Sequence, residues 1–216
     1  MNINEFYGFR EKLSGVTLQA HPINLNYQDD ENGFDDVIRL LIGDYNGINF
    51  PITFKQAYGK RLDDVIRTGH AVLYLISDNM KSVLEDNNLT GWKTFAVKVL
   101  TKKGEEVPGY HGLSITGRCG AIDYSKSEII KKQLVPNGPF GKFYKGYHIG
   151  LDKWDGSDFF LPEKYFGTVV TSRAAEILKK SKLTNIRLEN LSDIEIDAFT
   201  VQVAIENQQK NNEIIF

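Results

Sequence analysis

The chain is poor in cysteine, with only Cys119 among its 216 residues. A single cysteine excludes an intramolecular disulfide and a zinc site built from several thiolates. Long hydrophobic runs are also missing, because no apolar stretch approaches the roughly 20 residues that a membrane helix needs. The first residues, MNINEFYGFREKL, lack the apolar core of a secretory signal. These absences predict a cytoplasmic protein with no membrane-inserted segment.

The chain has no large excess of charge of either sign. Its 26 Lys and Arg stand against 28 Asp and Glu, a formal net charge of −2, which gives no reason to expect a nucleic-acid partner. The charge is nevertheless uneven. Residues 101–153 hold nine basic and five acidic side chains, a net of +4, whereas residues 1–70 hold seven basic and ten acidic, a net of −3. Such fluctuation is typical of an ordinary solvated surface, and it also fits a surface that binds a charged protein partner.

Motifs that carry common catalytic chemistry are absent. No glycine-rich segment has the spacing and the Lys-Ser/Thr ending of a phosphate-binding loop. The histidines, at positions 21, 70, 111 and 148, show no spacing typical of metal ligands. We therefore predict no cofactor and no metal. Cys119 is more typical of a small buried residue than of a nucleophile.

One stretch of the sequence occurs twice. Residues 75–97 align without a gap with residues 169–191, at a constant offset of 171 − 77 = 94 positions. Each copy opens with an apolar run that predicts a buried strand. A hydroxyl residue follows, Ser77 in one copy and Thr171 in the other, and either can cap the start of a helix.

The rest of each copy predicts a short helix and a second strand. An i, i+3, i+4 apolar stripe runs through about ten residues of both copies. Gly91, with Asn185 at the matching position, then provides a turn, because glycine and asparagine tolerate positive φ best. A strand follows the turn, so each copy is a strand-helix-strand unit and the pair is an internal repeat.

From these units we predict an α+β fold. The two repeated strand-helix-strand units, with their short helices, would pack on a shared mixed, mostly antiparallel sheet. Residues 1–61 are expected to form a β-rich N-terminal segment packed on the core, and residues 62–206 the core domain that contains the repeat. Residues 207–216 are expected to be a loose tail.

Three further segments have local patterns. Residues 95–101 and 110–116 flank a polar loop and predict a hairpin. Residues 128–132 predict a short helix, which Asp123 or Ser125 would cap. The apolar stretch within residues 194–205 predicts a last strand.

Two polar motifs carry the candidate site residues. The first is DYSKSE, residues 123–128, where the cap competes with an enzymatic interpretation in which Asp123 is a base and Lys126 stabilises charge. The second is WDGSDFF, residues 154–160, which begins with a tight-turn pair. Its aromatic rings are either core residues or, if exposed, anchors of a protein interface.

In this order, the repeat and the two motifs resemble the immunity proteins of bacterial polymorphic toxin systems, in particular a group filed as a domain of unknown function. The resemblance covers roughly residues 62–205, and residues 1–61 lie outside it. It implies a small cytoplasmic protein, encoded beside a toxin, that binds and neutralises that toxin without a shared catalytic site. Positions that match the family's motifs, most of them implied to be structural, are Asp123, Ser127, Trp154, Asp158 and Phe160.

Two hypotheses of function follow. In the first, the chain is a non-enzymatic binding protein, a monomer or homodimer, whose partner is a cognate toxin domain rather than nucleic acid or a membrane. Its candidate contact residues are Trp154, Asp155, Asp158, Phe159 and Tyr147. In the second, it is an enzyme whose site is assembled from Asp123, Lys126, His148 and Asp158. A weaker third hypothesis is a metal- or sugar-binding module that uses the aromatic strand at residues 143–147.

Overall fold

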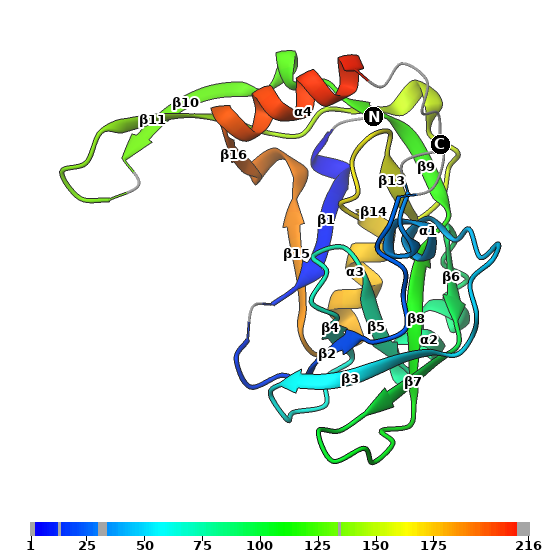
Figure 1. Ribbon diagram of the computed structural model, residues 1–216. Helices are drawn as coiled ribbons and strands as arrows, with labels where there is room; N and C mark the ends of the chain where they lie inside the picture. Colours follow the sequence, from blue (N-terminus) through cyan, green and yellow to red (C-terminus); the bar gives the residue numbers. More distant parts are fainter. Residues whose placement is uncertain (1–2, 13, 30–33, 134, 211–216) are drawn as a thin grey trace.

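The computed structural model describes residues 3–12, 14–29, 34–133 and 135–210. It confirms the α+β class, with four α-helices and sixteen strands in the described ranges (Figure 1). The strands form three mostly antiparallel sheets, whereas the sequence predicted one shared sheet. The helices are α1 (Asp36–Ile42), α2 (Asp78–Asp86), α3 (Ser172–Lys180) and α4 (Ala198–Lys210).

The two larger sheets each contain one copy of the repeat. In spatial order, the seven-stranded sheet consists of β6 (Trp92–Phe95), β8 (Tyr110–Ile115), β5 (Tyr74–Ser77), β4 (Val65–Arg67), β2 (Gln19–Pro22), β3 (Ile52–Tyr58) and β7 (Val97–Leu100). The six-stranded sheet consists of β12 (Ile149–Gly150), β9 (Gly117–Ile122), β13 (Phe159–Pro162), β14 (Val169–Thr171), β1 (Phe6–Glu11) and β15 (Ile186–Asn190). The third sheet consists of β10 (Glu128–Gln133), β11 (Phe140–Lys145) and β16 (Glu195–Asp197).

The structure shows the repeat at the predicted positions. Ser77 Oγ accepts a hydrogen bond from the third amide of α2, and Thr171 Oγ1 does the same for α3. Gly91 and Asn185 both have positive φ, +81° and +60°. A Cβ at Gly91 would overlap the carbonyl oxygen of Phe159, so this position also needs glycine for space.

The repeat is longer than the sequence comparison indicated. Val65 pairs with Ile76 between β4 and β5, and Phe159 pairs with Val170 between β13 and β14. Both pairs keep the offset of 94, so β4 and β13 are equivalent strands that precede the units as first defined. Strand β4 begins at Val65, ten residues before the first unit as the sequence comparison defined it.

Each unit takes in one further strand between its second and third strands. Strand β8 lies between β5 and β6 in the first unit, and β1 lies between β14 and β15 in the second. The register is equivalent as well: Gly112 faces Phe95 on one sheet, and Gly8 faces Glu189 on the other. Because β1 continues towards β2 and β8 continues towards β9, the chain crosses between the sheets twice. Whether residues 1–61 form a unit of their own stays a prediction.

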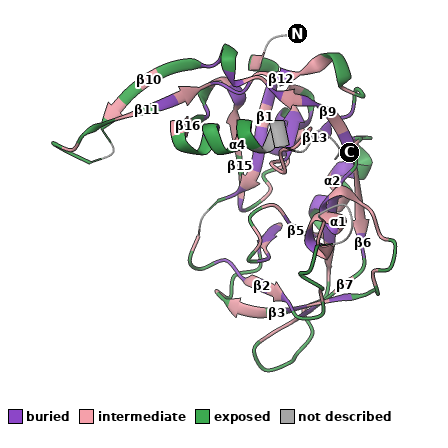
Figure 2. Cartoon of the chain, turned by 45° about the horizontal axis from the view of Figure 1, so that its top comes forward, coloured by how far each residue is buried: buried purple, intermediate pink, exposed green. Residues whose placement is uncertain are grey.

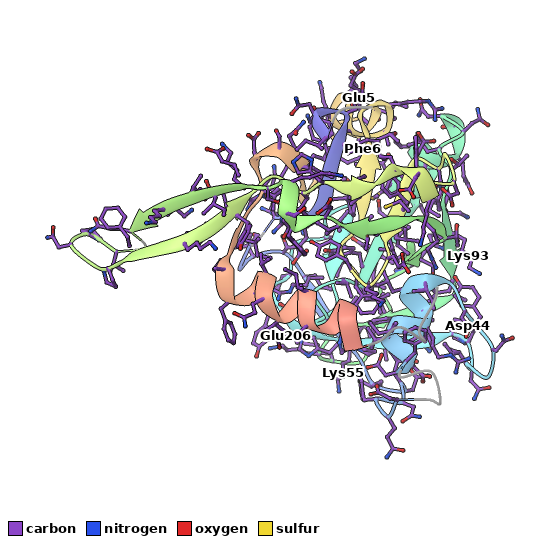
Figure 3. All side chains as sticks on the ribbon, turned by 90° about the horizontal axis from the view of Figure 1, so that it is seen from above. Glu5, Phe6, Asp44, Lys55, Lys93 and Glu206 are labelled. Carbon is purple, nitrogen blue, oxygen red and sulfur yellow. The ribbon has the colours of Figure 1, made fainter. Side chains whose placement is uncertain are left out.

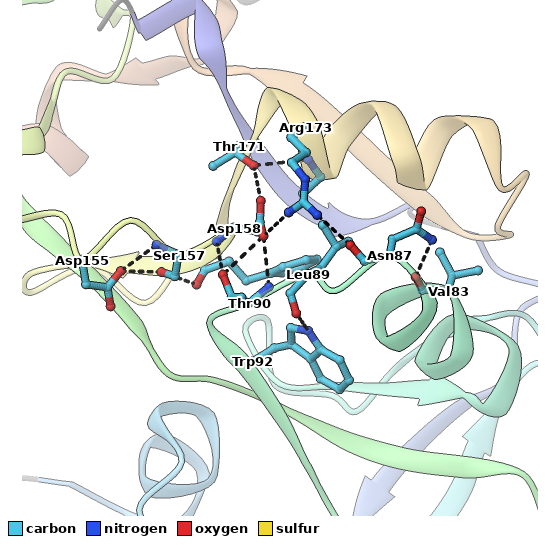
Figure 4. Close-up of polar contacts among 12 residues, drawn as sticks. Val83, Asn87, Leu89, Thr90, Trp92, Asp155, Ser157, Asp158, Thr171 and Arg173 are labelled. Carbon is cyan, nitrogen blue, oxygen red and sulfur yellow. Dashed lines mark hydrogen bonds and ion pairs between the residues drawn. The ribbon is translucent and has the colours of Figure 1, made fainter.

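Two aspartates, again 94 residues apart, link the units reciprocally. Asp158, in the second unit, accepts hydrogen bonds from the amide and hydroxyl of Thr90 in the first, at 3.0 and 3.3 Å (Figure 4). Asp64, in the first unit, accepts the same two bonds from Thr184 in the second, at 2.7 and 2.9 Å. We call these contacts the reciprocal ties.

The same carboxylates also hold the helix caps. The second oxygen of Asp64 accepts a bond from Ser77 Oγ at 2.7 Å, and that of Asp158 accepts one from Thr171 Oγ1 at 3.0 Å. Arg173 adds an ion pair to Asp158 at 2.7 Å. Burial alone would raise the pKa of Asp64, but the hydrogen bonds from Thr184 and Ser77 outweigh burial and lower it.

The hydrophobic core is shared between the units. One buried cluster combines Met80 and Leu84 of α2 with Ala174 and Leu178 of α3, and Phe159 lies in the same cluster. The stripes that predicted two amphipathic helices therefore face a common interior. Helices of nine residues are too short to be stable alone, so this packing is what keeps them folded.

Three local predictions are wrong. Strand β8 pairs with β6, whereas the predicted hairpin would have joined it to residues 95–101, most of which form β7 beside β3. Residues 128–133 form strand β10, not a helix, because they pair along their length with β11. In residues 194–205 only β16 is a strand. Asp197 then caps α4 by accepting bonds from the amide and hydroxyl of Thr200.

Two parts of the structure lie at its edges. Strands β10 and β11 form a two-stranded arm that extends away from the body, with α4 at its base (Figures 1 and 3). Helix α4 runs to Lys210, so the tail predicted at residues 207–216 begins within a helix. Residues 211–216 lie outside the described residues.

The reciprocal ties give a first testable prediction. Replacing Asp158 by alanine removes the acceptor for both Thr90 and Thr171. We expect D158A to lose about 2–3 kcal/mol of unfolding free energy, because part-buried donors lose their partner. D64A should lose about 1–2 kcal/mol, since Asp64 is more exposed and water can replace its partners. Urea unfolding at neutral pH measures both values.

The control is Asp86, an exposed carboxylate at the end of α2. D86A should change the free energy of unfolding by less than about 0.5 kcal/mol. Similar losses in D86A and D158A would show that the reciprocal ties carry no particular share of the stability.

Candidate functional site

The WDGSDFF motif forms a turn anchored to the start of β9. Asp155 accepts hydrogen bonds from the amide of Arg118 at 2.9 Å and from the amide and hydroxyl of Ser157 at 3.0 and 2.5 Å. The indole of Trp154 donates to the carbonyl of Ser157 at 3.1 Å. Burial opposes ionisation, but the bonds from Ser157 and Arg118 outweigh it and lower the pKa of Asp155. The polar side chains of the motif are thus engaged in holding the turn.

The side chains predicted to contact a partner fall into two groups. Phe159, Tyr147 and Asp158 are buried, with exposures of 0%, 5% and 6%. Their side chains face the interior, so they can support a surface but not form it. Trp154 is half-buried against Phe6, and Asp155 is exposed. The sequence left open whether the rings of this motif are core residues or exposed anchors, and Phe159 is a core residue.

A shallow groove of about 410 Å³ lies beside this turn. It is lined on one side by Asp155 and Ser157 and on the other by Thr90 and Gly91 of the first unit. The groove therefore lies where the two units meet, next to the reciprocal tie of Asp158. Of the predicted contact residues, Asp155 lines this groove, whereas Tyr147 lines the larger cavity described below.

The DYSKSE motif is a capped turn. Asp123 accepts bonds from the amide and hydroxyl of Ser125, at 3.1 and 2.5 Å, and caps the short 3-10 helix Tyr124–Lys126. Lys126 lies 3.0 Å from the same carboxylate. Hydrogen bonds from Ser125 and Lys126 lower the pKa of Asp123, which makes it a poor general base at neutral pH. Ser127 donates to the carbonyl of Gly146 at 2.6 Å and fixes the end of the turn.

The four residues of the enzyme hypothesis do not form one site. Asp123 meets His148 only through the backbone, where its amide donates to the His148 carbonyl at 2.7 Å. Asp158 precedes β13, which pairs with the beginning of β9, while Asp123 follows the end of β9. The six residues of β9 separate the two carboxylates by about 20 Å. The predicted assembled catalytic site is therefore wrong.

A larger cavity, of about 730 Å³, opens between β1 and the segment that joins β13 to β14. Three arginines line it, and each forms an ion pair: Arg10 and Arg187 pair with Glu189 at 3.4 and 3.0 Å, and Arg67 pairs with Glu11 at 3.5 Å. Tyr147 reaches this cavity from a ring cluster of buried tyrosines. Each arginine has a glutamate partner within the chain, but Glu189 serves two of them, so the three arginines and two glutamates keep a net charge of +1.

Among the described residues, no three His, Cys, Asp or Glu side chains are grouped so that they could hold a metal ion. Among the histidines, His111 bonds to Asp78 at 2.7 Å, and His21 bonds to Gln19 at 2.9 Å. Burial raises the pKa of the Cys119 thiol to about 12, so this thiol is protonated and unreactive at neutral pH. In the described residues, no helix has both the length and the apolar character needed to cross a bilayer.

A comparison with models of protein families shows which family the chain belongs to. Residues 14–193 match the model of the immunity protein family Imm11. The chain belongs to this family. The match begins well before residue 62, so it covers β2, α1 and β3, which the sequence resemblance left out. A search of curated proteins gives no match to this Imm11 chain.

Sequence reasoning missed the exposed residues of the arm. Phe140, Val135 and Ile129 are 68%, 59% and 57% exposed, so three large apolar side chains lie in solvent on this short segment. The signal was present in the charge count, since the net of +4 found in residues 101–153 lies within residues 126–145. The helix predicted at residues 128–132 hid this signal, because a strand places every second side chain on one face and so groups other side chains than a helix does.

The turn at Asp155 predicts a specific pH dependence of stability. Because the folded pKa of Asp155 lies below its unfolded value, its contribution is present above the unfolded pKa and is lost as the pH falls through the folded pKa. Wild-type stability should therefore decline more steeply between about pH 5 and pH 2 than that of D155N. Urea unfolding across this range measures the difference, and parallel curves would contradict it.

Proposed function

We propose that this protein is a non-enzymatic immunity protein of the cytoplasm, which binds a cognate toxin domain and neutralises it. The observation that carries the proposal is the match of residues 14–193 to the Imm11 immunity family. Neutralisation follows from occupying a surface that the toxin needs, so the partner is a folded protein domain encoded by a neighbouring gene.

The use of the polar motif residues supports binding rather than catalysis. The carboxylates of Asp123, Asp155 and Asp158 each accept two or more hydrogen bonds from their own chain. A carboxylate whose acceptor sites are filled by hydrogen bonds from its own chain serves as a structural cap. Within the described residues, these motifs stabilise turns and leave the surface free to be varied for recognition.

Trp154 and Asp155 remain candidate contact residues. They lie at the surface beside the groove between the two units, whereas the other predicted contact residues are buried beneath. A rigid turn is a suitable contact element, because its side chains lose little conformational freedom on binding.

The proposal is tested by mixing the purified protein with the toxin domain of the adjacent gene. We expect a complex with one immunity protein per toxin domain, measured by calorimetry and native mass spectrometry. Growth of cells that express the toxin should recover when the immunity protein is co-expressed. The mass of the toxin should be unchanged after denaturing separation, because binding leaves no covalent mark.

An enzyme would behave differently. It would inactivate many toxin molecules per copy and alter either their mass or that of a small molecule. Protection at amounts far below one equivalent would contradict the binding proposal. Failure of the two proteins to associate, together with unrelieved toxicity, would contradict the assignment to toxin neutralisation.

A further inference from the structure

The arm is built so that much of it has no partner in its own chain. Strands β10 and β11 pair over their full length, from Glu128 opposite Lys145 to Gln133 opposite Phe140. Strand β16 covers β11 only at residues 143–145. The outer part of β11 and the whole outer edge of β10 therefore have no neighbouring strand in the described chain. Free edges of this kind can accept a strand from another protein.

The arm concentrates positive charge. Residues 126–145 contain five lysines and one glutamate, a net of +4. Lys126 pairs with Asp123, and Lys132 pairs with Glu195. No ion pair within the described residues involves Lys131, and Lys142 contacts only the ring of Tyr144, at 4.9 Å.

Lys131 and Lys142 lie directly opposite each other on the two strands. Like charges in this position destabilise a strand pair. Folding therefore gains nothing from two lysines here, although the neighbouring Lys132 has its own carboxylate. An external carboxylate placed between the two ammonium groups would relieve their repulsion.

Exposed apolar side chains lie on the same face as these lysines. Cross-strand partners share a face, and every second residue returns to it. Ile129, Lys131 and Gln133 of β10 therefore share a face with Lys142 and Phe140 of β11. We call this surface the arm face. Figure 2 shows β10 as largely exposed, and Phe140, 68% exposed, is among the most exposed large apolar residues described.

We propose that the arm face, with the free edge of β10, is a docking surface for an acidic surface of the toxin domain. Phe140 and Ile129 are the apolar anchors, and the Lys131–Lys142 pair receives a carboxylate of the partner. This inference rests on the proposed function and adds a second contact surface to the turn of Trp154 and Asp155.

The positive charge and the exposed apolar side chains of the arm face together favour an acidic protein surface as the partner. A second copy of this chain would bring another arm with a net charge of +4 against the first, and the two would repel. Nucleic acid would satisfy the lysines but would leave Phe140 and Ile129 without apolar contacts. An acidic protein surface uses the lysines, the rings and the β10 edge at once.

The test compares two variants with the same change of charge. K131E/K142E reverses the charge of the arm face, and K102E/K103E does so in the exposed loop after β7. The arm variant replaces one like-charged pair by another, so its melting temperature should stay near that of the wild type. Calorimetry with the toxin domain should show a Kd raised about tenfold or more for K131E/K142E and less than about threefold for K102E/K103E.

A third variant separates apolar anchoring from charge. F140S should also weaken binding about tenfold. The Kd of F140S should rise with salt as steeply as that of the wild type, because its lysines remain, whereas the Kd of K131E/K142E should depend less on salt. Circular dichroism confirms that each variant is folded before its affinity is interpreted.

The outcomes distinguish the inference from the function on which it rests. Wild-type affinity in both K131E/K142E and F140S would overturn the arm face as the docking surface while leaving toxin neutralisation intact. Failure of the wild type to bind the toxin would overturn both. Two further outcomes would assign the arm face to another partner if K131E/K142E leaves toxin binding unaffected. Loss of binding to a 20-base-pair duplex in this variant would assign the arm face to nucleic acid. Loss of self-association in this variant would assign it to a second copy of the chain.

Discussion

The structure depends on two aspartate side chains. Each lies in one repeat unit and accepts hydrogen bonds from a threonine of the other unit. Asp64 holds the turn at Thr184, and Asp158 holds the turn at Thr90. Each also fixes the hydroxyl that caps its own helix. One side chain thus sets both the start of a helix and the position of that helix relative to the opposite unit. The buried cluster that α2 and α3 share can then pack against a defined geometry.

The sequence predicted the features that local chemistry determines. A hydroxyl before an apolar stripe gave both caps, and Gly91 and Asn185 gave both turns, because each depends on only a few neighbouring residues. It did not predict which strands pair, since β8 meets β6 rather than β7 only when the whole sheet is assembled. The cap at Asp197 was overlooked because the β-branched residues that follow it also suit a strand. Asp64 could have been found, as it lies at the same offset from Asp158 as the rest of the repeat.

The candidate site shows the same division. Asp155 and Asp123 were identified as polar residues of interest, and both serve as acceptors that organise turns. The rings of Phe159 and Tyr147 could not be placed from the sequence, since a turn residue is either exposed or buried according to what packs over it. The arm was hidden for a different reason. Its lysines and apolar residues form one surface only if the segment is a strand, because every second side chain of a strand lies on the same face.

The place of β1 in the six-stranded sheet, whose other strands all follow the seven-stranded sheet in the chain, has a consequence for how the chain folds during synthesis. Strand β1 is made before the other strands described, yet its neighbours β14 and β15 follow about 160 and about 180 residues later. The seven-stranded sheet is complete once β8 has emerged, so it can assemble while translation continues. The six-stranded sheet must wait for β15, and until β14 emerges both edges of β1 have no partner strand. Among the described strands, β1 is therefore the first to be made and one of the last to be paired.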